Sequence, residues 1–491
     1  MKKKHTAADS EQPSFLRRCI LQRAELLQNP QKVIIGFFTF FVVVVPQVIL
    51  QHEWPFSVLL GMIMLDILFF YLFFFCLCGH RSTGTKLGLS QFYLVSALTA
   101  IYFLAANLID NNAFYQGIMP ISIALPTALI ILLVTIMVNV RHARTMGLLL
   151  PLGAFLNGSF DFYSFIFALM SGIAASFVLR GAKRRIDMVN AGCILALVHV
   201  VTVLALLLFQ NLPLAVYPAI VGFAALNGIA SGMLVLGITP VLEQLMRTAT
   251  AFRLIELLDL GAPLMRLLAS KTPGTYSHSL VVANLAEAAC QEIGAHSLLG
   301  RVGAYYHDIG KIDQPDYFVE NQRAGNKHDD INPRLSATVI RSHVKVGIEK
   351  GRAAGLPNEV IDIIASHHGN SLIAYFYNEA LKKEENVDME DFCYPGHPPQ
   401  TKEAAVVMLA DVTEAAVRTL DKPGSSRLEK FINELITKKV DSAQLSESEL
   451  TFRELETIKK VFVRVLAGYY HTRIEYPNQP KESKEPAKDD A

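Results

Sequence analysis

Several features are scarce in this 491-residue chain, and each scarcity excludes a class of protein. The six cysteines are scattered and form no paired ligand motif, so neither a disulfide scaffold nor a thiolate zinc site is expected. The 45 basic and 44 acidic residues leave a net charge of +1, which argues against a general nucleic-acid binder. Strand-like alternation of apolar and polar residues is also scarce, and the sequence therefore predicts an all-α protein.

Apolar residues make up 52% of the chain and are concentrated in its first half. From about Arg253 onward, in contrast, charged residues recur every few positions. Seven segments of the first half are long enough, or nearly so, to cross a hydrocarbon core of roughly 30 Å: 33–50, 56–78, 91–109, 116–139, 161–179, 188–209 and 213–241. An eighth apolar segment, 145–157, is shorter. We therefore predict a helical membrane bundle followed by a helical soluble domain.

The segment 145–157 is short and contains Pro151, but the distribution of charge indicates that it also crosses the membrane. Fifteen Lys and Arg residues lie in alternate breaks between the apolar segments, and the other breaks have none; the charged breaks are 1–32, 79–90, 140–145 and 180–187. Loops enriched in Lys and Arg face the cytoplasm. The pattern predicts eight spans, with the N-terminus and the soluble domain in the cytoplasm.

Changes in composition divide the chain into five predicted parts. They are a cytoplasmic N-terminal segment 1–32, a membrane domain 33–242, connecting helices 243–272, a soluble domain 273–476 and a disordered tail 477–491. The connecting part has Leu and Arg at helical spacing, so we expect amphipathic helices that offer a route for a signal.

Seven side chains that bind metals recur in order down the soluble domain: His278, His307, Asp308, His343, His367, His368 and Asp411. Proline, glycine and capping residues predict helices over 275–294, 298–310, 333–354 and 359–368, a helix opened by Thr401, and one opened by a capping box from Thr451 to Glu454. Most of the seven then lie in first or last turns, with His278 in a first turn and His307 and Asp308 in a last turn.

Imidazole and carboxylate ligands suit iron, manganese or zinc. Seven ligands exceed the needs of one tetrahedral metal, and a bridging Asp308 would allow two metals about 3.5–4 Å apart to clamp a phosphoryl group. Adjacent His-Asp and His-His pairs inside apolar runs are also hard to explain by packing alone. Nearby, Lys311 either offers a positive charge to a phosphate or lies in solvent past the helix end.

The motif HisAspIleGlyLys, with flanking histidines and a distal aspartate, resembles the HD superfamily of metal-dependent phosphohydrolases. Longer stretches resemble the seven-transmembrane HD hydrolases, the PgpH-type cyclic-di-AMP phosphodiesterases of bacteria; these stretches are 272–279, 301–312, 320–322, 366–372, 394–396 and 409–418. The resemblance runs from about residue 33 to Pro477.

This resemblance implies a membrane-anchored phosphodiesterase that hydrolyses cyclic di-AMP to pApA through a hydroxide activated by two metals, expected to be iron or manganese. His278, His307, Asp308 and Asp411 would hold one metal, and Asp308, His343, His367 and His368 the other. Asp308 and Lys311 are the expected catalytic residues. The expected location is the bacterial inner membrane and the expected partners are a cyclic dinucleotide and the lipid bilayer, with no nucleic-acid polymer; a homo-oligomer is left open.

The chain departs from this family in two places. Only the loop 51–55 separates the first two spans, where the family typically carries a sizeable extracytoplasmic domain. Cys393 and His397 flank TyrProGly where Arg and often Pro are expected. The alternatives left open are a cyclic-di-GMP phosphodiesterase, a nucleotidase, and a membrane receptor whose HD domain binds nucleotide without turnover.

Overall fold

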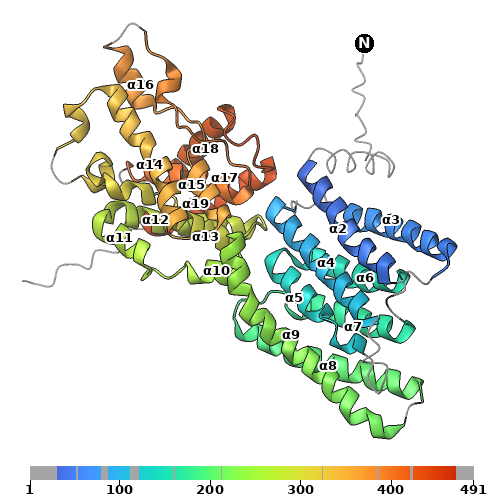
Figure 1. Cartoon of the computed structure of the whole chain (residues 1–491). Helices are drawn as coiled ribbons and strands as arrows, with labels where there is room; N and C mark the ends of the chain where they lie inside the picture. Colours follow the sequence, from blue (N-terminus) through green and yellow to red (C-terminus); the bar gives the residue numbers. More distant parts are fainter. Residues whose placement is uncertain are drawn as a thin grey trace, which may run out of the picture. The chain divides into compact units, whose positions relative to one another are not determined.

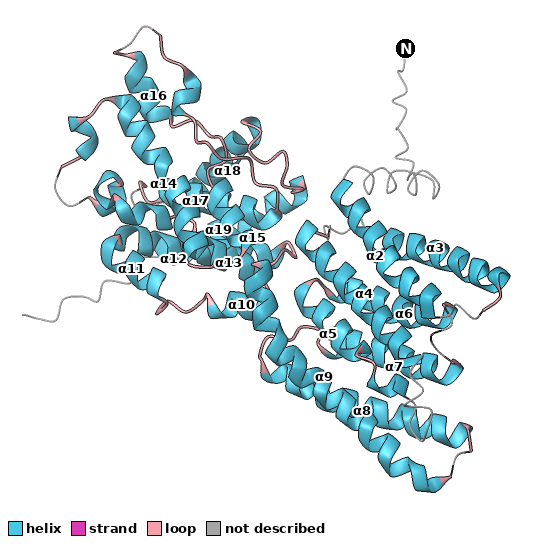
Figure 2. Ribbon diagram, in the orientation of Figure 1, coloured by secondary structure: helices cyan, strands magenta, loops and turns pink. Residues whose placement is uncertain are grey.

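The computed structural model forms two compact units, Met1–Arg253 and Leu254–Ala491 (Figure 1). It describes residues 30–470 apart from 51–53, 79–86, 111–120, 158, 160, 212, 323, 324, 384, 385 and 421–423. Most of the predicted N-terminal segment and all of the predicted tail lie outside these residues. The described residues contain no strand, only an isolated bridge between Leu372 and Cys393 (Figure 2). The predicted all-α fold is therefore confirmed.

Eight α-helices account for most of the described first unit, and each overlaps one predicted span. They are α2 (Pro30–Leu50), α3 (Phe56–Cys78), α4 (Leu89–Asp110), α5 (Thr127–Met137), α6 (Val140–Leu156), α7 (Phe162–Val178), α8 (Ile186–Phe209) and α9 (Tyr217–Met246). Five of them, α2, α3, α4, α8 and α9, are long and apolar enough to cross a membrane. That all eight helices cross stays a prediction.

Within the described part of the predicted span 116–139, helix α5 has only 11 residues, and residues 116–120 lie outside the described residues. Pro126 stands at its N-cap, where a residue without an N–H and with a fixed φ cannot extend a helix backward. A short 3-10 helix, Ile121–Ala124, precedes it. Nine of the eleven α5 residues are buried, so α5 lies in the interior of the bundle.

Large apolar side chains cover the outside of the first helices. Phe37, Phe38 and Phe41 on α2 are each more than half exposed, and Phe56 at the start of α3 is 81% exposed. A water-facing surface rarely carries so continuous an apolar area, whereas lipid is a good solvent for it. The surface of the helices and their length identify a membrane protein.

The connecting segment differs in detail from its prediction. Helix α9 continues to Met246, five residues beyond the predicted end of the last span. Two shorter helices follow, α10 (Ala251–Glu256) and α11 (Pro263–Lys271). The boundary between the two compact units, after Arg253, lies within the predicted connecting part 243–272. The two ends of that part stay predictions.

The described residues of the second unit form eight further α-helices and several 3-10 turns. The α-helices are α12 (Pro273–Glu292), α13 (Ser297–Tyr306), α14 (Pro333–Ala353), α15 (Asn358–Ser366), α16 (Ala374–Leu381), α17 (Lys402–Val417), α18 (Ser425–Asp441) and α19 (Phe452–Tyr470). The starts of α14 and α17 follow their predicted capping residues. The Asn332 side chain accepts a hydrogen bond from the Leu335 N–H at 2.7 Å, and Thr401 caps α17 in the same way.

The capping box that opens α19 gives a first test of the fold. The Thr451 hydroxyl accepts from the Glu454 N–H at 3.2 Å, and the Glu454 carboxylate accepts from the Thr451 N–H at 2.8 Å. We expect Thr451→Ala to destabilise the second unit by about 1 kcal/mol. Thr457→Ala, inside the same helix, is the matched control and should lower the Tm less. Equal Tm values for both variants in a thermal unfolding assay would contradict this role.

Candidate metal centre

Helix ends position the first three candidate ligands, with two corrections to the predicted geometry. Helix α12 begins at Pro273, so His278 lies in its second turn and not its first. Helix α13 ends at Tyr306 and not at Gly310; His307 is its C-cap, and Asp308 precedes a 3-10 helix, η5 (Ile309–Asp313).

The reason for the early end of α13 is a close backbone approach at Gly310. A Cβ atom added at Gly310 would lie 1.8 Å from the His343 carbonyl oxygen and 2.7 Å from the Gly347 nitrogen. The tight 3-10 turn therefore packs directly on the backbone of α14. This packing brings Asp308 next to His343, although 34 residues of sequence separate them.

The other four candidate ligands come from three helices. His343 lies in the middle of α14, His367 is the C-cap of α15, and His368 follows it directly. Asp411 lies in the middle of α17, the helix that Thr401 caps. All are buried except His368, whose side chain is 20% exposed.

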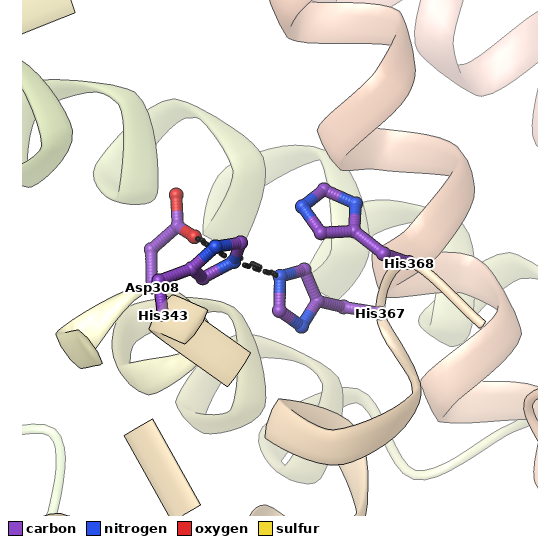
Figure 3. Close-up of side chains that lie close together, drawn as sticks. All are labelled: Asp308, His343, His367 and His368. Atoms are coloured by element: carbon purple, nitrogen blue, oxygen red, sulfur yellow. Dashed lines mark hydrogen bonds and ion pairs between the residues drawn. The ribbon is translucent and has the colours of Figure 1, made fainter. Parts of the chain in front are cut away.

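The fold brings all seven candidate ligands into two adjoining groups. In one, nitrogen and oxygen atoms of Asp308, His343, His367 and His368 lie within 4.8 Å of one another (Figure 3). In the other, atoms of His278, His307 and Asp411 do so. Both groups draw their members from helices far apart in the sequence, so only the folded chain can form them.

The two carboxylate oxygens of Asp308 face different groups. Its Oδ2 lies 3.3 Å from His307 Nε2 and 4.0 Å from His278 Nε2. Its Oδ1 lies 3.5 Å from His343 Nε2 and 3.7 Å from His367 Nε2. This is the arrangement that a carboxylate needs in order to bridge two cations.

Three of the histidines are oriented by their own helices. His307, His343 and His367 each direct Nδ1 at the carbonyl oxygen three residues earlier. A carbonyl only accepts, so Nδ1 carries a proton in each of the three rings, and in a neutral ring Nε2 then keeps a free lone pair. Such a hydrogen bond fixes the tautomer in which Nε2 can bind a metal.

The facing nitrogen atoms test whether this cluster fits a cation. His343 Nε2 and His367 Nε2 lie 3.2 Å apart, and each presents a lone pair to the other. The buried Asp308 Oδ1 also has no hydrogen-bond partner within the described residues. Opposed lone pairs and unpaired buried acceptors are unfavourable unless a positive charge lies between them. The donor set therefore fits metal ions, although the role of the seven as ligands stays a prediction.

Burial and neighbouring charges divide the histidines by protonation state. Burial lowers the pKa of His367 to about 3 and also lowers the pKa values of His343 and His368. Burial opposes protonation of His307 as well, but the Asp308 carboxylate raises its pKa to about 10. For His278, hydrogen bonds to Asp411 and to Glu414 outweigh burial and raise the pKa to about 9. The neutral histidines already have the state that metal binding requires.

The structure contradicts one of the two predicted environments of Lys311, a side chain in solvent past the helix end, while a charge offered to a phosphate stays a prediction. Its ammonium lies 2.7 Å from Asp308 Oδ2 and 2.9 Å from Glu320 Oε1, and its side chain is 12% exposed. Burial opposes the charge, but these two carboxylates raise the pKa of Lys311. Lys311 is thus a buried, paired cation at the edge of the cluster.

Two residues that contact the cluster were missed by the sequence reasoning. The Glu414 carboxylate is hydrogen-bonded to Nδ1 of His278, the nitrogen that faces away from the cluster. The Tyr394 ring stacks on the His368 ring at a centroid distance of 4.2 Å. The spacing of Glu414, three residues after Asp411 on α17, was a usable signal because such residues share a helix face.

Glu414 gives a test that does not depend on the substrate. We expect Glu414→Gln to weaken the binding of Mn²⁺ by about 10- to 100-fold, the effect typical of a carboxylate that orients a metal-binding histidine. Isothermal titration of metal into the apoprotein measures this directly. Glu429→Gln, on the exposed face of α18, is the matched control. Unchanged affinity in Glu414→Gln would show that the carboxylate has no such role.

An open cavity of about 500 Å³ lies beside the cluster. Its charged and ring-bearing lining includes His278, His368 and Tyr394, and its apolar lining includes Phe318 and Ile340. The size is in the range of small-molecule sites. A nucleotide-sized ligand could therefore lie against the candidate ligands.

Comparison with known protein families gives two matches on this chain. Residues 54–250 match the family described as "7TM receptor with intracellular HD hydrolase", and residues 275–416 match the HD domain. The first stretch contains the seven helices α3 to α9. The second contains all seven candidate ligands.

Two curated relatives are similar to this chain over more than half of its length. The cyclic-di-AMP phosphodiesterase PgpH of Bacillus subtilis is 42% identical over 330 residues, which cover 67% of this chain and 46% of that protein. The PgpH of Listeria monocytogenes is 37% identical over 405 residues, which cover 81% of this chain and 55% of that protein. The chain thus spans about half the length of these relatives.

A solved structure and a more distant relative match the second unit or part of the chain. The HD domain of Listeria monocytogenes PgpH, in complex with cyclic-di-AMP, is 43% identical with a TM-score of 0.42, covering 44% of this chain and all of that one. Ribonuclease Y of Acholeplasma laidlawii is 38% identical over 94 residues, which cover 19% of this chain and 14% of that protein. Taken with the helices and the clustered histidines, the two family matches show that the chain belongs to the seven-transmembrane receptors with an HD hydrolase domain.

Proposed function

We propose that this chain is a membrane-anchored phosphodiesterase that hydrolyses cyclic di-AMP to linear pApA. In this reaction the bond between phosphorus and the 3′ oxygen breaks, a bond from water oxygen to phosphorus forms, and a proton ends on the 3′ oxygen. The relatives that carry this name are 37–42% identical to the chain. The expected cofactors are two divalent cations, iron or manganese.

The observation that carries the proposal is that the two oxygens of the Asp308 carboxylate face different groups of histidines. One oxygen faces His278 and His307, and the other faces His343 and His367. We assign His278, His307, Asp308 and Asp411 to one cation, and Asp308, His343, His367 and His368 to the other. When bound, a cation pair at such a site supplies Lewis acidity to a phosphoryl group and lowers the pKa of water.

Three residues around the candidate ligands orient them or compensate their charge. The Glu414 carboxylate accepts a hydrogen bond from His278 Nδ1–H, which leaves Nε2 directed at the cluster. Lys311 places a protonated amine beside Asp308 and limits the negative charge of the buried carboxylates. Tyr394 stacks on His368 and restricts the tilt of its ring.

We also propose that the HD domain lies in the cytoplasm of a bacterial cell, at the inner membrane. The support is the charge pattern of the breaks between spans, with fifteen Lys and Arg residues on one predicted side and none on the other. A cytoplasmic site would meet a soluble nucleotide. Labelling of cysteines introduced at positions 82 and 112, with a membrane-impermeant reagent on intact cells, should modify only the second.

One assay separates this function from its alternatives. The full chain, purified in detergent and loaded with Mn²⁺ or Fe²⁺, is incubated with cyclic di-AMP, cyclic di-GMP, a mononucleotide and an RNA oligonucleotide. Chromatography should show cyclic di-AMP converted to pApA fastest. Selective cleavage of cyclic di-GMP or RNA would replace the proposed substrate. Metal binding without cleavage of any of the four would favour a receptor.

A further inference from the structure

The cavity beside the cluster has two positively charged side chains that are not candidate ligands, and only one of them is paired. Lys311 is paired with Asp308 and Glu320. Arg418 also lines the cavity, is exposed, and has no ion pair among the described residues. The acidic lining residues are engaged elsewhere, because Glu320 pairs with Lys311 while Asp411 and Glu414 contact His278. Arg418 therefore presents an uncompensated positive charge to whatever enters the cavity.

The position of Arg418 on α17 relates it to the cluster. It follows Asp411 by seven residues, which is close to two turns of helix, so the two side chains project from nearly the same face. The rise between them is about 10 Å. Ala415 and Ala416 lie between them in the lining, and such small side chains leave room for a ligand along this wall.

We propose that Arg418 binds the second phosphate of a cyclic dinucleotide, the one that is not cleaved. This inference rests on the proposed function and names how the site would select its substrate. The cluster holds one phosphodiester, and the ring of a cyclic dinucleotide carries another that needs its own cation. A planar guanidinium donates two parallel hydrogen bonds to phosphate oxygens, which suits this task better than an ammonium.

A purely structural reading of Arg418 makes a different prediction. Arg418 is the C-cap of α17, and its backbone N–H donates a hydrogen bond to the Glu414 carbonyl oxygen at 3.0 Å. A positive charge there interacts favourably with the helix dipole, which contributes typically 0.3–1 kcal/mol. That role would lower the Tm of an alanine variant without a selective effect on one class of substrate.

The test compares a substrate that has two phosphates with one that has a single phosphate. Full-length Arg418→Ala and Arg418→Lys, loaded with Mn²⁺ in detergent, are assayed on cyclic di-AMP and on bis(p-nitrophenyl) phosphate. We expect Arg418→Ala to raise the KM for cyclic di-AMP by about ten-fold or more, the scale of losing charged hydrogen bonds, with kcat changed less. Hydrolysis of bis(p-nitrophenyl) phosphate should change by less than about two-fold, since that ester has no second phosphate to bind.

Controls separate failure of this inference from failure of the proposed function. Arg418→Lys should give an intermediate KM, and Arg352→Ala, exposed on α14 and outside the cavity, should match the wild type. If wild type cleaves cyclic di-AMP and Arg418→Ala has the same KM, or loses both activities equally, the inference alone is overturned. If wild type cleaves only bis(p-nitrophenyl) phosphate, the proposed function and this inference fall together.

Discussion

Asp308→Ala is expected to abolish hydrolysis of cyclic di-AMP and to reduce the bound metal from two ions to one or none. The two oxygens of the Asp308 carboxylate face the two groups of histidines, with Oδ2 towards His307 and Oδ1 towards His343. Its loss would remove a ligand from each cation and leave His307 and Lys311 without their nearest counter-charge. We expect the rate to fall by at least about 10³-fold, more than the 10- to 100-fold typical of outer-shell residues.

Metal analysis by mass spectrometry, together with the chromatographic assay, measures both parts of this expectation. Asp441→Ala is the matched control, since Asp441 is exposed at the end of α18, outside the cluster and the cavity. Its metal content and rate should equal those of the wild type. Retention of two metals and of more than a tenth of the rate in Asp308→Ala would rule out a bridging role for this carboxylate.

Gly310→Ala is expected to destabilise the HD domain by about 3 kcal/mol and to impair the site at the same time. The added methyl group would lie 1.8 Å from the His343 carbonyl oxygen, and a backbone atom cannot rotate out of the way as a side chain can. Either η5 or α14 must shift, and this separates Asp308 from His343. For a domain of this size the Tm should fall by roughly 6–12 °C.

Differential scanning fluorimetry and the activity assay test this prediction together. Gly468→Ala is the matched control, because Gly468 lies in α19 and an added Cβ atom would have no heavy atom within 4 Å. That substitution should be neutral or should stabilise the helix by up to about 1 kcal/mol. A Tm for Gly310→Ala equal to that of Gly468→Ala would contradict the close approach of η5 to α14.

Much of the local structure could be predicted because its causes are local. The starts of α14, α17 and α19 follow from Asn332, Thr401 and Thr451, whose side chains accept hydrogen bonds from N–H groups only three residues away. The predicted helix ends were less accurate. At Tyr306 the cause of the end is Gly310 packing on α14, a contact with a distant segment that no capping rule includes.

The candidate site could also be predicted only in part. Side-chain chemistry and order indicated seven metal-binding groups, and the motif around Asp308 indicated the family. The pairing of Lys311 with Glu320 and the unpaired charge of Arg418 in the cavity could not be predicted, because each depends on which segments lie side by side.

The sequence by itself determined that this is an all-helical membrane protein that resembles the HD hydrolases. The length of the apolar segments, the residues that begin and end helices, and the HisAsp motif are each local properties of the chain. Only the tertiary structure decided that the seven side chains form two adjoining groups, with the Asp308 carboxylate facing histidines of both. The reason is geometric, since a site built from α12, α13, α14, α15 and α17 exists only where these helices pack and where Gly310 lets two backbones touch.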